Sequence, residues 1–234
     1  FQAEDGIRDA QESRGLGDVY KRQMEFDIVK LEIELKKRLL YPYNWGLKQN
    51  NDLDKITNFI YRTFYFDDLI KKIDDKFSNH SDKNLLFNYS LNRWFNFWSA
   101  RAVQSFFLTN QRVKPAEFSE DRLKDFYIDD IPFDHKTSVY PKNFRLSPLD
   151  VKQNPFPLIK WFYQNQSQQN RKHFANRLFL VVYSELNEHW KLKAELNLLK
   201  THIDSYLSSF KPEKLVRLQL EGKEILSDLI MVIK

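Results

Sequence analysis

The 234-residue chain contains no cysteine, only two methionines and only five glycines. The absence of cysteine excludes disulfide frameworks, cysteine-ligated zinc or iron–sulfur centres and a cysteine nucleophile. No apolar run approaches the roughly 18 residues that a membrane-spanning helix needs, and no secretory signal segment is recognisable. We therefore expect a cytoplasmic protein with no membrane partner.

The first 23 residues resemble a translated sequencing adapter. In a single reading frame, Gln2 to Asp9 and Ser13 to Gln23 can be back-translated into the two ends of a common short-read adapter, and Ala10 to Glu12 fill the index between them. Artefacts of this kind are set aside before the fold is considered. We therefore treat residues 1–23 as not native and leave the true N-terminus before Met24 open.

Deleting residues 1–23 is expected to leave the melting temperature of the protein unchanged. A translated adapter was never selected to pack against this chain. Thermal unfolding of the full and shortened proteins checks this, and a fall of several degrees would make the segment part of the fold.

Excluding the segment leaves two glycines, Gly46 and Gly222, in 211 residues. Glycine-rich phosphate loops of the P-loop and Rossmann kinds, and the G-x-S-x-G turn of esterases, are therefore excluded. The segment holds four basic and five acidic residues, so the remainder carries 33 basic and 27 acidic side chains, a formal net charge of +6. A modest positive charge of this size favours a polyanionic partner without identifying it.

The hydrophobic pattern predicts helices first and a strand-rich centre afterwards. Helical spacing dominates residues 24–89, and an unusually aromatic apolar face predicts a buried helix over 90–108. Further expected elements are an irregular loop with four prolines over 140–157, a helix over 158–174, a strand over 177–184, a helix over 188–210 and closing strands over 214–220 and 224–234. This order predicts an α/β fold with a mixed β-sheet flanked by helices and a helical N-terminal region.

Two segments are expected to form the centre of the sheet. Residues 125–139 alternate and are rich in aromatic and β-branched side chains, with Asp129-Asp130 as a two-residue hairpin turn that pairs Phe126 with Phe133. The continuous apolar run over 177–184 is typical of a strand covered on both faces.

Three charged side chains of the hairpin form the candidate site. The expected register places Asp125 opposite Asp134, and Lys136 shares a strand face with Asp134 because residues two apart point the same way. Two opposed carboxylates repel each other unless a cation joins them, so we expect Asp134→Ala to leave stability unchanged or increased. A Mg²⁺ ion needs only one or two carboxylates, with water and substrate phosphate as its other ligands.

These residues resemble the PD-(D/E)XK, or restriction-endonuclease-like, nuclease superfamily. The resemblance rests on Asp125 in KDFYID and on Asp134-His135-Lys136 in IPFDHKTS, and it covers roughly residues 90–184. It implies a restriction-endonuclease-like sheet, a Mg²⁺ (or Mn²⁺) ion on Asp125 and Asp134, and Lys136 as the residue that positions or activates the attacking water. Residues 24–234 then form a single nuclease-like domain, with a helical part over 24–89 and a catalytic core over 90–234.

The chain departs from the family pattern at two points. Lys124 stands where the family has proline, and no glutamate lies in 90–108, where some members place a further metal ligand; Glu117, Glu120 or Gln104 are weak substitutes. Acid-x-Lys triplets also occur at four other places in the chain, but only Asp134 lies on a hairpin strand with an acid facing it.

A second group of residues is assigned to nucleic acid. Gln and Arg read base edges or contact phosphate, and in several branches of the superfamily the helix after the lysine strand carries one of them beside the active site. The predicted nucleic-acid-binding residues are Arg112, Lys114, Gln169, Arg171 and Lys172. A polar helix end and a solvated surface are the alternatives for these positions.

Three functions remain open from the sequence. The first is a Mg²⁺-dependent endodeoxyribonuclease, for example a restriction or other defence enzyme. The second is a non-cutting DNA-binding or accessory protein on the same fold, and the third is a helical interaction protein with an incidental hairpin. Whether the protein forms a homodimer is also left open.

Overall fold

The structure is a computed structural model that describes residues 27–45, 47–116, 124–165 and 175–234. It has a six-stranded mixed sheet with the strand order β1-β2-β3-β4-β6-β5. The strands are β1 Val113–Pro115, β2 Phe126–Ile128, β3 Ile131–Val139, β4 Arg177–Tyr183, β5 Val216–Leu220 and β6 Lys223–Ile233. The expected α/β class with a mixed sheet and flanking helices is confirmed.

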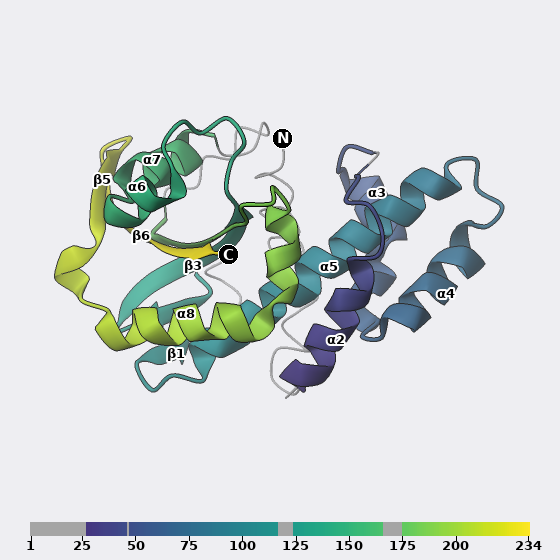
Figure 1. Ribbon diagram of the computed structural model, residues 1–234, viewed down its shortest axis with the longest axis horizontal. Helices are drawn as coiled ribbons and strands as arrows, with labels where there is room; N and C mark the ends of the chain where they lie inside the picture. Colours follow the sequence, from purple (N-terminus) through teal and green to yellow (C-terminus); the bar gives the residue numbers. More distant parts are fainter. Residues whose placement is uncertain (1–26, 46, 117–123, 166–174) are drawn as a thin grey trace.

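Helices cover both faces of this sheet and form a separate group at one end (Figure 1). The α-helices of the described residues are α2 Ile28–Arg38, α3 Asn51–Ile56, α4 Phe66–Phe77, α5 Lys83–Leu108, α6 Pro148–Gln153, α7 Phe156–Gln164 and α8 Leu196–Ser209. Short 3-10 helices lie at η1 Asn58–Arg62, η2 His189–Ala194 and η3 Pro212–Lys214. The N-terminal helices α2, α3 and α4 gather around the first half of α5, and the second half of α5 reaches the sheet (Figure 1).

The hairpin of β2 and β3 has the register that the sequence predicts. Phe126 pairs with Phe133 and Ile128 with Ile131. The two turn residues, Asp129 and Asp130, have φ angles of 47° and 66°. Aspartate tolerates this left-handed region better than most residues, and two-residue hairpin turns of the mirror-image type need it at both positions.

Strand β4 lies inside the sheet, as its apolar sequence predicts. It pairs in parallel with β3 on one side and with β6 on the other. Leu178, Leu180 and Val182 belong to one apolar cluster, which α5 and α8 cover, whereas Phe179 and Val181 belong to a second cluster under α6 and α7. Both faces of the strand are therefore buried, which explains why its sequence shows no alternation.

Three expected segments differ from the structure. Residues 140–157 are not one irregular loop, because α6 lies within them and α7 begins at Phe156. Ser147 caps α6 in a capping box with Asp150, and Pro148 is its first residue. Proline is favoured at this position because the first helical N–H has no partner within the helix, so the prolines mark helix starts here. The helical spacing over 24–89 is likewise divided among α2, α3, η1, α4 and the start of α5, and the helix expected over 188–210 is divided between η2 and α8.

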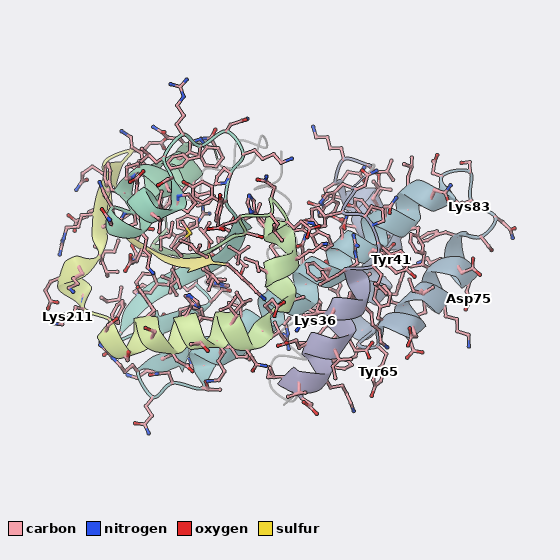
Figure 2. The ribbon with its side chains drawn as sticks, in the orientation of Figure 1. Lys36, Tyr41, Tyr65, Asp75, Lys83 and Lys211 are labelled. Atoms are coloured by element: carbon pink, nitrogen blue, oxygen red, sulfur yellow. The ribbon has the colours of Figure 1, made fainter. Side chains whose placement is uncertain are left out.

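The N-terminal helices share one apolar core with the sheet. The same cluster of buried side chains includes Leu31 and Leu35 of α2, Trp94 of α5 and Val232 of β6. In Figure 2, Lys83 and Lys211 lie at opposite ends of the long axis of the molecule, with this core between them.

Candidate functional site

Asp134 is a buried carboxylate held between two buried cations. Its Oδ1 lies 3.1 Å from Lys136 Nζ, and its Oδ2 accepts a 3.1 Å hydrogen bond from Arg177 Nε. Asp134 is 3% exposed, and Lys136 and Arg177 are each 1% exposed. Charged side chains are almost never buried this fully unless they are paired, so these three residues, the charged triad, stabilise one another's charges.

The strands position the triad on the face of the sheet that α6 and α7 cover. Asp134 pairs with Arg177, and Lys136 pairs with Phe179. Because paired residues of neighbouring strands point to the same side, all three charged side chains share the face on which Phe179 packs. The prediction that Asp134 and Lys136 point the same way is confirmed.

Asn176 holds the strand ends together beside the triad. Its side-chain Nδ2 donates to Pro132 O at 3.1 Å, its Oδ1 accepts from Leu226 N at 2.8 Å, and its main-chain O accepts from Asp134 N at 2.9 Å. One residue therefore links β3, β4 and β6 at the point where the triad begins, and this fixes the positions of Asp134 and Arg177 relative to each other.

Asp125 lies beside the triad but uses its carboxylate differently from the prediction. The ladder between β2 and β3 ends at Phe126 and Phe133, and Asp125 Oδ2 accepts a 2.8 Å hydrogen bond from His135 N. The carboxylate of Asp125 thus accepts from the main-chain N–H of His135 just beyond the end of the β2–β3 ladder, while His135 pairs with Leu178 of β4. The repulsion between Asp125 and Asp134 that the sequence suggested is offset, because Asp134 is compensated by two cations.

Arg177 is the member of the site that sequence reasoning missed. Its guanidinium carbon lies 5.4 Å from the centre of the Tyr163 ring of α7, in addition to the ion pair with Asp134. Burial raises the pKa of Tyr163, whose hydroxyl donates to Ala175 O at 2.8 Å. The sequence does contain a signal that could have identified Arg177. It is the only charged residue of an apolar strand that is covered on both faces, and it stands at the first position of that strand.

His135 faces the opposite side of the sheet, as predicted from the alternation. Its ring centre lies 5.4 Å from that of Phe107 of α5, and its Nε2 lies 3.3 Å from Thr137 Oγ1. The histidine therefore packs in the core beneath α5 and does not join the charged triad.

The two described nucleic-acid-binding candidates lie at the hairpin turn. Arg112 forms an ion pair with Asp129 and also donates to the main-chain oxygens of Leu207 and Phe210, near the end of α8. Lys114 forms an exposed 2.8 Å ion pair with Asp130. Arg112 thus ties the hairpin turn to α8. The candidates Gln169, Arg171 and Lys172, and the substitutes Glu117 and Glu120, lie outside the described residues.

The donor chemistry of the site fits a magnesium ion. Asp125 and Asp134 supply carboxylate oxygens, which Mg²⁺ prefers, and Mg²⁺ commonly uses only one or two protein carboxylates. Among the described residues no group of three or more His, Cys, Asp or Glu side chains gathers at one point. Any cation on Asp134 would share its oxygens with Lys136 and Arg177.

A second, partly buried acid lies on the opposite face of the sheet. Asp228 of β6 accepts hydrogen bonds from Tyr206 Oη at 3.0 Å and from Leu229 N at 2.8 Å. Burial raises the pKa of the Asp228 carboxyl above its usual value of 3.8, because desolvation disfavours the ionised form.

Asp228→Asn is expected to remove a pH-dependent loss of stability. A carboxyl whose pKa is raised by folding binds more protons in the folded than in the unfolded state, so its stabilising contribution is present at low pH and is lost as the pH rises through its folded pKa. The variant should therefore gain stability relative to the parent as the pH rises from about 4 to 7. Urea unfolding across that range measures the difference, and a difference that is constant with pH would contradict it.

A scan against protein-family models and searches of curated proteins and of solved structures each find no match to this chain. Within the described part of the chain, no helix is both long enough and apolar enough to cross a membrane. We therefore infer the function from the geometry of the site.

Proposed function

We propose that the protein is a Mg²⁺-dependent endodeoxyribonuclease that hydrolyses phosphodiester bonds of DNA. The observation that carries the proposal is the charged triad: Asp134 and Lys136 share one strand face, 3.1 Å apart and buried, beside the carboxylate of Asp125. The pattern is the one on which the resemblance to PD-(D/E)XK nucleases rests.

The cost of the triad also favours a functional role over a purely structural one. Taking charges out of water costs several kcal/mol per ion, roughly, and an apolar replacement of a buried ion pair is often as stable or more stable. The neighbouring positions on this face, Phe179 and Val181, show that the sheet accepts apolar side chains here. Charged groups kept in such a place are candidates for chemistry.

Each residue has a distinct role in the proposed reaction. Asp125 and Asp134 would hold the metal ion, which when bound supplies positive charge for the phosphate and lowers the pKa of coordinated water. Lys136 would orient the attacking water through its ammonium group, which is fixed next to Asp134, and would stabilise the negative charge that develops as the water loses its proton to the solvent. The hydrogen bond from His135 N to Asp125 fixes the direction of that carboxylate.

One observation favours a second function, a DNA-binding protein that does not cut. Lys136 and Arg177 already offset the charge of Asp134, and they do so at both of its oxygens. If both ion pairs of Asp134 are kept when DNA binds, the two cations attract phosphate but the carboxylate of Asp134 cannot bind a metal ion.

Cleavage and retention assays separate these functions. The purified protein is incubated with plasmid and with oligonucleotide duplexes in Mg²⁺, in Mn²⁺ and in EDTA. Metal-dependent cleavage supports the nuclease, whereas salt-sensitive retention of DNA without cleavage supports the second function. The absence of both would contradict the proposal and leave a helical interaction protein.

A further inference from the structure

One side-chain nitrogen of Arg177 is buried without a hydrogen-bond acceptor among the described residues. Within the part of the chain that the structure describes, Nη1 of Arg177 is buried and has no hydrogen-bond acceptor, although Nε of the same guanidinium binds Asp134. Buried polar groups are nearly always hydrogen-bonded, and a missing partner calls for an explanation such as a bound ion or ligand. A guanidinium has five N–H donors and no acceptor, so only an acceptor from another group can satisfy this nitrogen.

A second atom on the same face of the sheet has the same property. Ser138 Oγ is buried and has no hydrogen-bond partner among the described residues. Ser138 lies two residues beyond Lys136 on β3 and pairs with Val181 of β4. The polar groups on this face therefore form a row under α6 and α7 that includes Arg177, Lys136 and Ser138. Its two cations lie toward the Arg177 end of the row, and Ser138 lies at the other end.

The guanidinium is held in a fixed orientation. Nε is bound to Asp134 and the plane packs near Tyr163, so the direction of Nη1 is set before any ligand arrives. Asn176, the neighbouring residue, links three strands at this point. A planar group with preset donors suits phosphate oxygens, which arginine binds through two N–H groups at once.

The residues beside Arg177 at its strand end are less buried than Arg177 itself. Arg177 is the first residue of β4, at the end of the strand, and the residues next to the site, Asn176 and Asp125, are only partly buried. Because the less buried neighbours of Arg177 are at this strand end, a phosphate would have to reach Nη1 from the side of Asp125 and Asn176.

We propose that Arg177 is the phosphate-binding residue of the site, and that its Nη1 donates to a phosphodiester oxygen of the bound nucleic acid. This inference rests on the proposed action on DNA and adds a contact that neither the acid-x-Lys motif nor the basic residues of the hairpin supply. Asp134 has a corresponding second role, because it positions the guanidinium through Nε.

The salt dependence of DNA binding tests the contact. A short duplex of mixed sequence is titrated in EDTA across about 50 to 200 mM salt, so that neither cleavage nor a metal ion contributes. Each phosphate contact adds about 0.9 to the slope of log K against log salt for B-DNA. Arg177→Met should lower the magnitude of the slope by about that amount, whereas Arg177→Lys should retain it. Arg217→Met removes an exposed arginine that pairs with Glu224 on β5 and β6 and should leave the slope unchanged.

A slope for Arg177→Met equal to that of the parent would overturn the contact and leave the proposed function intact. If the parent binds no DNA, both functions proposed above fail, and inorganic phosphate then decides the contact alone. The guanidinium signals of Arg177 in a ¹⁵N-arginine-labelled parent, assigned by their loss in Arg177→Lys, should shift as phosphate is added. This second measurement needs no substitution in the protein that binds the phosphate, so it also decides the case if Arg177→Met fails to fold. Signals that stay unchanged would overturn the proposal.

Discussion

Replacing Lys136 by methionine is expected to lower the rate of Mg²⁺-dependent DNA cleavage about a hundredfold or more, because a positioned group that stabilises charge developing in the transition state contributes about that much. Methionine keeps an unbranched chain of similar length in the buried position. The remaining ion pair between Asp134 and Arg177 keeps the carboxylate compensated. The measurement is initial cleavage of a plasmid under saturating metal, with thermal unfolding to show that the variant is folded.

Asp125→Asn gives a matched test of the metal-binding carboxylate. The amide oxygen can still accept the hydrogen bond from His135 N, so the local backbone is preserved while the charge is lost. Residues that act as a unit in catalysis are not additive, so Asp125→Asn and Lys136→Met should each remove most of the activity, and the double variant little more. Lys83→Met, a change at the end of the molecule opposite Lys211 and away from the sheet (Figure 2), is the control for charge alone. A parent that cuts while both variants cut at the parental rate would place the site elsewhere.

Asp134→Ala is expected to destabilise the protein by about 3–5 kcal/mol, since removing one partner of a buried ion pair leaves the other charge uncompensated. Here two cations, Lys136 and Arg177, would be left without their shared carboxylate. This reverses the prediction from sequence, in which Asp134 faced another carboxylate and its removal cost nothing. The structure changes the sign because it brings Arg177 to Asp134 from a different strand.

Replacing all three charged residues together should cost far less than replacing one. Apolar residues of similar volume in place of a buried charged cluster are often neutral or stabilising by about 1–4 kcal/mol. The triple variant Asp134→Leu, Lys136→Met, Arg177→Met should therefore be close to the parent in stability but inactive. Urea unfolding midpoints of the parent, the single variant and the triple variant measure this. A stable Asp134→Ala variant would show that the ion pairs contribute little and would restore the repulsion argument.

Local sequence determined the hairpin and the strand face that carries Asp134 and Lys136. Side chains alternate along a strand with a period of two, so the shared face follows from spacing alone. Two consecutive aspartates that accept positive φ angles fix a two-residue turn and hence the register of Phe126 with Phe133. The apolar run of β4 likewise predicted burial on both faces, because only a covered strand lacks a polar side.

Tertiary structure alone decided what surrounds Asp134. Arg177 lies 43 positions further along the chain, and it reaches Asp134 only because β3 and β4 pair in parallel with Asp134 opposite Arg177. The register of a parallel pair depends on the packing of the helices that connect the strands and not on a local turn. Asp125, by contrast, meets His135 N within the hairpin itself, where the β2–β3 ladder ends at Phe126. Spacing in the sequence therefore located the acids and the lysine, whereas the pairing of distant strands determined which charges those acids meet.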